Sequence, residues 1–208
     1  MLNSHWFDRL ERRFGEWCVP QLASFIVGMN AIVWAMTMMR PAFPAVLSLE
    51  PELVMRGQVW RLFTFLLIPP TMSPIWMFFW LYILYIYASA LEAEWGDFRF
   101  NLYYGIGAVS TILASMFLGV GLSNVPLQTS LFLAFAALYP DFEVLIMFIL
   151  PAKVKWLAWL AWAGMAWNML ASNGATRVAL AASLVNYAVF FGSDHWETAR
   201  RWLKSRRK

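Results

Sequence analysis

The sequence feature that most constrains this chain is the run from Pro74 to Leu91, which contains no charged residue. Pro69 and Pro70 precede the run, and Glu92 follows it. An apolar run of about 18 residues is long enough to cross the roughly 30 Å of a bilayer's hydrocarbon core as a helix. The run therefore predicts a membrane-spanning helix.

The composition of the whole chain points to the same environment. Of the 208 residues, 61% are hydrophobic and 13% are charged, whereas about 25% are charged in ordinary soluble domains. A soluble chain of this length would have to bury nearly all of these apolar side chains, while a membrane protein exposes them to lipid. Because no linker rich in Gly, Ser or Pro divides the sequence, we expect one membrane domain at residues 20–192, between an N-terminal amphipathic segment at 1–19 and a basic tail at 193–208.

Five further apolar segments accompany the central run, so the sequence predicts an all-α membrane protein with a bundle of six spanning helices. The other five segments are residues 21–39, 101–121, 127–139, 156–171 and 177–192. Residues 127–139 are marginal for crossing alone, and we expect this helix to lie in the centre, shielded by the others. Residues 144–150 are too short to cross and predict an interfacial dip of the chain.

The connection between the first two spans, residues 40–71, is long and rich in proline. Its apolar part, residues 62–68, is too short to span, so we expect the loop to be half-immersed in the bilayer. Trp60 then lies at the interface, where aromatic rings gather. We expect the Arg61 guanidinium to bond to backbone carbonyls or to lipid phosphate.

The distribution of basic residues predicts how the bundle is oriented. Six spans place both chain ends on one side of the membrane. Twelve of the basic residues lie at the two ends and in the turns on that side, and four lie on the other side. Cytoplasmic segments carry the excess of Lys and Arg, so both termini are predicted to be cytoplasmic. The basic tail then contacts anionic lipid rather than nucleic acid, and the short ends favour a bacterial inner membrane.

One face of the third span consists of small residues at every fourth position. These residues are Gly107, Thr111, Ser115 and Gly119. Small residues at this spacing let two helix backbones approach closely, so we interpret the face as a helix-packing surface. Asn30, a polar residue in the middle of the first span, is expected to hydrogen-bond to another helix.

Several motifs follow one another at defined spacings along the chain. They are Trp60-Arg61 in the long first loop, Leu91-Glu92-x-x-Trp95-Gly96 at the end of the second span, a short fourth helix, the passage at residues 134–159, and Asn186-Tyr187 followed by Phe190-Phe191-Gly192 in the sixth span. Together these motifs resemble the rhomboid superfamily over residues 20–192. The resemblance implies the six-helix architecture of that superfamily.

Rhomboid proteases cut peptide bonds within the membrane with a Ser-His dyad, so the resemblance also implies where such a dyad would lie. The serine stands in Gly-x-Ser-Gly at the start of the fourth helix, the histidine lies on the sixth, and a His and an Asn on the second hold the oxyanion. Here the dyad positions are Val125 and Leu180, and the oxyanion positions are Trp76 and Trp80. None of the four side chains matches the family's chemistry.

A search of the residues without any alignment gives the same result. A serine becomes a nucleophile when a base lies within hydrogen-bond reach, but the two histidines, His5 and His195, fall in the terminal segments. No lysine lies within a span, and Ser123, Ser130 and Ser183 therefore have no evident partner. The spans also hold no cluster of His, Cys or carboxylate side chains, so we expect neither a metal nor a cofactor.

The inactive branches of the superfamily, including the derlins, imply the function that we expect. This is a non-catalytic pseudoprotease that binds the transmembrane segment of a client membrane protein, with membrane lipids as its other partners. Two alternatives stay open. The first is an active intramembrane serine protease with unrecognised catalytic residues. The second, a transporter or channel, has less support because no charged residue marks a path through the middle of a span.

Overall fold

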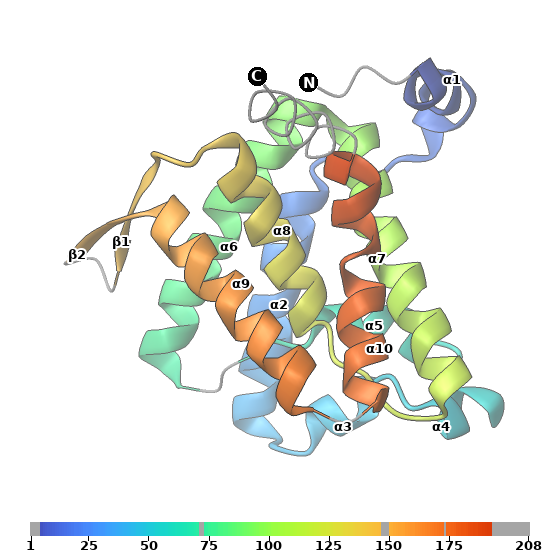
Figure 1. Cartoon of the computed structure of the whole chain (residues 1–208). Helices are drawn as coiled ribbons and strands as arrows, with labels where there is room; N and C mark the ends of the chain where they lie inside the picture. The colour runs from blue at the N-terminus through green and yellow to red at the C-terminus, as the bar shows by residue number, and fades with distance from the viewer. Residues whose placement is uncertain (1–4, 71–72, 147–149, 173, 193–208) are drawn as a thin grey trace.

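The computed structural model describes residues 5–70, 73–146, 150–172 and 174–192 as a bundle of helices (Figure 1). An N-terminal helix, α1 (His5–Phe14), and a short 3-10 turn, η1 (Gly15–Trp17), precede the bundle. The basic tail predicted at residues 193–208 lies outside the described residues.

Three of the helices are long and apolar enough to cross a bilayer. They are α2 (Leu22–Met39), α6 (Pro74–Trp95) and α7 (Asp97–Leu118). The shorter helices that complete the bundle are α8 (Val125–Leu138), α9 (Val154–Ala171), α10 (Gly174–Ser183) and a last helical segment at residues 185–192. The described residues thus form a helical membrane protein with three helices of spanning length, where the sequence predicted six spans.

Single glycines set the ends of the two longest helices. Gly96 has φ +79° and separates α6 from α7, while Gly119 has φ +66° and ends α7. A positive φ is readily adopted by glycine, which lacks a Cβ, so these positions stop one helix without a long loop. As a result α6 extends beyond the predicted end of the second span, and α7 begins before the predicted start of the third.

The short helix α8 lies at the centre of the bundle, as its length predicted. Eight of its residues are buried, on every side of the helix. It packs against α6, α7, α9 and α10, and Figure 1 shows it enclosed by the surrounding helices. A helix of 14 residues is too short to cross the hydrocarbon core alone, and its neighbours therefore supply the apolar surroundings that lipid would otherwise provide.

The long loop between α2 and α6 folds into short helical pieces at one end of the bundle (Figure 1). These are α3 (Phe43–Leu47), α4 (Pro51–Met55), α5 (Arg61–Thr64) and the 3-10 turn η2 (Phe65–Leu67). Pro44 and Pro51 stand at the starts of α3 and α4, where a missing N–H costs nothing. Leu49 pairs with Leu122 through an isolated β-bridge, which holds the loop to the segment before α8.

A short antiparallel ribbon follows α8 within an otherwise helical fold and overlaps the segment 144–150, for which the interfacial dip stays a prediction. It consists of β1 (Glu143–Ile146) and β2 (Leu150–Lys153), with Glu143 opposite Lys153. The β-branched Val144 and Ile146 favour an extended backbone, and Pro151 cannot sit inside a helix. Residues 147–149 lie outside the described part of the chain.

The chain begins and ends its described course at the same end of the bundle. In Figure 1, α1, the α6–α7 corner and residues 185–192 approach this end, while α3 and α4 lie at the other. Which of the two ends faces the cytoplasm stays a prediction.

Candidate functional site

Arg61 ties the long loop together. Its side chain is 4% exposed, and its Nη1 donates hydrogen bonds to the carbonyl oxygens of Ala45 and Ser48, each at 2.8 Å. Its Nε donates to Gln58 Oε1, also at 2.8 Å. The sequence predicted that Arg61 bonds to backbone carbonyls or to lipid phosphate, and the structure shows backbone carbonyls as its partners. The neighbouring Trp60 points outward and is 48% exposed.

Asn124 holds the same loop against the start of α8. Its Nδ2 donates to the carbonyl oxygens of Leu66, at 2.9 Å, and Ile68, at 3.0 Å. Asn124 is buried and directly precedes Val125, the position at which the resemblance implies a nucleophile. Sequence reasoning missed this anchor, although a buried amide at the start of an apolar helix requires polar partners.

A hydrogen-bonded cluster joins α7, α8 and the last helical segment in the middle of the bundle. Asn186 Nδ2 donates to Ser130 Oγ at 3.0 Å and to the Tyr103 carbonyl at 3.4 Å. Ser130 Oγ donates in turn to the Leu127 carbonyl at 2.7 Å, and the Tyr103 hydroxyl donates to the Ser130 carbonyl at 2.9 Å. All three polar side chains are buried. We call Tyr103, Ser130 and Asn186 the polar core.

Gly107 lets the polar core close. A Cβ at this position would clash with Leu127 Cδ1 and lie 2.7 Å from Asn186 Nδ2. The absence of a side chain therefore permits α7 to approach both α8 and the last helical segment, as small residues do where membrane helices cross.

The other members of the small-residue face have different roles. Thr111 Oγ1 donates to the Gly107 carbonyl at 2.9 Å within α7, and Ser115 Oγ donates to the Val120 carbonyl at 2.7 Å. Gly119 lies beyond the end of α7, and a Cβ there would meet nothing within 4 Å. The packing role predicted for Gly119 is therefore corrected: its positive φ ends the helix.

The four positions implied for a catalytic site are spread over separate surroundings. Val125 is 44% exposed at the start of α8, and Leu180 is buried in α10. Trp76 is 50% exposed near the start of α6, whereas Trp80 packs against the core. Three serines were considered as nucleophiles in the sequence. Ser123 is exposed, Ser130 belongs to the polar core, and the side chain of Ser183 lies outside the described part. His195 also lies outside it.

The motif at the end of α6 connects three parts of the bundle. Glu92 Oε1 accepts a hydrogen bond from the backbone N–H of Ala23 at 3.3 Å and so satisfies a donor in the first turn of α2. Trp95 is buried, with its ring centroid 5.2 Å from that of Tyr103 and 5.4 Å from that of Phe190. Gly96 then turns the chain into α7. These contacts fix the corner between the two longest helices.

Three buried side-chain atoms in the described residues have no hydrogen-bond partner: Asn30 Oδ1, Tyr104 OH and Gln128 Nε2. The Asn30 amide donates to the Ile26 carbonyl at 2.8 Å within α2. This corrects the expectation that Asn30 bonds to another helix. The Asn30 Oδ1 oxygen accepts no hydrogen bond from the residues that the structure describes.

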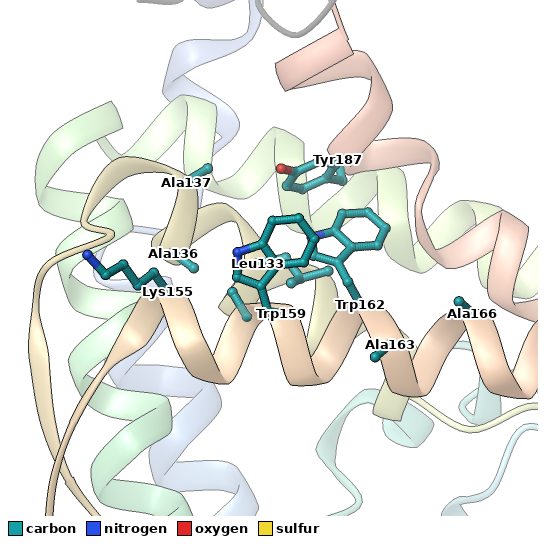
Figure 2. Close-up of a pocket in the computed structure, with 10 residues that line it drawn as sticks. Leu133, Ala136, Ala137, Lys155, Trp159, Trp162, Ala163, Ala166 and Tyr187 are labelled. Atoms are coloured by element: carbon teal, nitrogen blue, oxygen red, sulfur yellow. The ribbon is translucent and has the colours of Figure 1, made fainter.

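An apolar groove of about 780 Å³ runs along α9, facing α8 and the last helical segment. Figure 2 shows Trp159, Trp162 and Tyr187 gathered around its middle, with Lys155 at one end and Ala166 at the other. Only Val154 of α9 is buried among the described residues of that helix. The groove therefore lies beside a helix that is mostly exposed. We call it the α9 groove.

No group of three or more His, Cys, Asp or Glu side chains in the described part of the chain is placed to hold a metal ion. The predicted lack of metal and cofactor stays a prediction.

A family model with the description "Eukaryotic integral membrane protein (DUF1751)" matches residues 20–192. The comparison with curated proteins gives no match. The family description names eukaryotic proteins and so gives no support to the bacterial inner membrane predicted from the short ends.

Proposed function

Because the chain belongs to the eukaryotic integral membrane protein family DUF1751, we propose that it is a rhomboid-like pseudoprotease that binds transmembrane segments of other membrane proteins without cleaving them. The motifs around Trp60-Arg61 and Glu92 support the rhomboid-like part of the proposal. In the structure both motifs hold the scaffold together, by bonding the first loop to itself and α6 to α2.

The bonding of Ser130 carries the proposal. Its hydroxyl donates to the Leu127 carbonyl and accepts from the Asn186 amide. Neither partner takes up a proton at neutral pH, whereas activation of a serine requires a base within hydrogen-bond reach. Stabilisation of the oxyanion is usually the largest single contribution to acyl transfer. Of the two positions implied for the oxyanion donors, Trp76 is exposed and Trp80 packs against the core. A buried serine with these partners supports helix packing rather than catalysis.

Exposed aromatic side chains on α6 and α9 support a binding role. On α6, Trp76 and Phe78 are exposed, and on α9, Trp156 and Trp167 are exposed outside the α9 groove. Both helices pack against α8. A client helix that lies along this side gains packing contacts with large rings, which is how helices associate where lipid removes the hydrophobic driving force.

Photo-crosslinking in the membrane tests client binding. We expect a crosslinking amino acid at Phe78 to capture membrane proteins, and the same amino acid at Leu113 to capture several-fold less. Leu113 is 64% exposed on α7, which lies on the other side of the bundle in Figure 1. Equal capture at both positions, or capture of lipid alone at Phe78, would contradict client binding.

A fluorophosphonate probe tests the missing protease activity separately. We expect no labelling of Ser123 or Ser130 in the folded protein, because among the described contacts neither hydroxyl is hydrogen-bonded to a histidine, a lysine or a carboxylate. Ser123 is the sharper control, because it is exposed and lines a cavity of about 370 Å³ together with Glu50. Labelling that is lost in Ser123→Ala or Ser130→Ala would establish the active protease instead.

A further inference from the structure

The α9 groove has the form of a binding site that the proposed function does not use. Its α9 side is formed by one face of the helix. The residues on that face are Lys155, Ala158, Trp159, Trp162, Ala163 and Ala166. They recur at helical spacing, so they form one continuous stripe. Ala136 of α8 and Tyr187 face this stripe from the other side (Figure 2). A volume of about 780 Å³ lies in the range of sites that hold small molecules.

The length of the groove decides between a protein helix and a lipid. From Lys155 to Ala166 the groove covers about 16 Å of helix, at 1.5 Å per residue. A spanning helix must cross roughly 30 Å of hydrocarbon, whereas one leaflet supplies about half of that thickness. The groove therefore matches the acyl chain of a lipid in one leaflet and covers only half of a spanning helix.

The charge at one end of the groove supplies the place for a headgroup. The Lys155 ammonium has three donors, and one of them bonds to Asp141 Oδ1 at 2.8 Å. Lys153 Nζ lies 3.9 Å from the same carboxylate oxygen, so two cations share it. Asp141 is itself 70% exposed, so its bond to Lys155 competes with water. Beyond Lys155 the groove is lined by apolar side chains, with the indole and phenol groups of Trp and Tyr the exceptions.

We propose that the α9 groove binds one membrane phospholipid, with the phosphate on Lys155 and an acyl chain along α9 as far as Ala166. Access is from the side, because Trp159 is 71% exposed. The lipid lies between α8 and α9 and covers the apolar side chains that line the groove. This site is independent of client binding, since it requires neither Phe78 nor a second protein.

Photolabelling of the full chain in lipid nanodiscs tests the proposal. The probes are phosphatidic acid and diacylglycerol that carry the same diazirine-labelled acyl chain, so they differ only in the phosphate. We expect phosphatidic acid to label peptides of α8 and α9 that line the groove, and Lys155→Gln to lower this labelling about fivefold. Arg40→Gln is the control: it removes an exposed cation that directly follows α2 and does not line the groove, so the labelling should stay unchanged.

A steric pair of variants on α9 tests the groove itself. Ala163→Phe fills the groove, and excluding even two methylenes of the chain should lower labelling about tenfold. Leu160→Phe places the same ring on α9 at a residue that is 70% exposed and outside the groove, so labelling should persist. Thermal unfolding of both variants checks the fold. Equal labelling in the two variants, or equal labelling by the two probes in the wild type, would overturn the proposal. Capture of a protein by a crosslinker at Ala163 would likewise overturn it.

Discussion

The neighbouring helices α8 and α9 are similar in sequence character and opposite in environment. Both are apolar, and yet α8 buries eight residues whereas only Val154 is buried among the described residues of α9. The difference arises at the crossing points. Gly107 and the polar core allow close approach and fixed hydrogen bonds around α8. The tryptophans of α9 instead remain exposed, and Trp159 and Trp162 line the α9 groove. Hydropathy alone therefore does not separate a core helix from a peripheral one.

The same contrast assigns different tasks to the two helices. The region around α8, where the resemblance to rhomboid proteases implies a serine, is tied together by Asn124 and by the polar core. The region around α9 is open and apolar, with one lysine at its end. Stability is thus concentrated at α8, while contacts with lipid or protein remain available at α9. Matched substitutions in the two regions test this division.

The largest effect is expected for Gly107→Val. The added side chain would clash with Leu127 and press on Asn186, and overpacking of this kind destabilises a core by about 1–3 kcal/mol. Gly164→Val is the matched control, because a Cβ at Gly164 in α9 meets nothing within 4 Å. Unfolding midpoints in detergent measure both changes. An equal loss in the two variants would remove the contrast between α8 and α9.

A smaller effect is expected for Asn186→Leu, which keeps the branching of the side chain and removes the amide nitrogen that donates two hydrogen bonds in the polar core. Hydrogen bonds between membrane helices contribute about 0.6 kcal/mol on average, so we expect a loss of about 1 kcal/mol. Asn168→Leu is the control, since Asn168 is exposed and bonds only to Gly164 of its own helix among the contacts described. A double-mutant cycle with Ser130→Ala isolates the Asn186–Ser130 pair. A coupling energy near zero would show that this bond does not hold α8.

Local rules predicted the features that depend on local geometry. The central place of α8 followed from its length, because a helix of that size has to be shielded. For Arg61 the sequence predicted backbone carbonyls or lipid phosphate as partners, and the structure shows carbonyls, which satisfy a buried guanidinium. The spacing of small residues pointed to Gly107, but it also included Gly119, because a period of four does not reveal where the helix ends.

The remaining features depend on contacts between distant parts of the chain. Asn186 and Ser130 are 56 residues apart, and Asn124 and Leu66 are 58 residues apart. No local pattern states which buried amide meets which partner, and for Asn30 the expected neighbour was wrong. The ribbon of β1 and β2 was missed for a related reason, since a short apolar run does not by itself distinguish strand from helix.

The smallest effect concerns the charged end of the α9 groove. The hydrogen bond and charge of Lys155 lower the pKa of Asp141 below its ordinary value. A carboxyl whose pKa is lowered in the folded state stabilises the protein at pH values above the ordinary pKa of that carboxyl. This stabilisation is lost as the pH falls through the lowered pKa of the folded state. Exposed ion pairs contribute little, so we expect almost no change in the unfolding midpoint. The titration itself is measurable: NMR of the Asp141 carboxyl should give a lowered pKa that returns toward the ordinary value in Lys155→Gln. An unchanged pKa in that variant would show that Lys155 does not hold Asp141, and the lysine would then be oriented by other groups at the end of the groove.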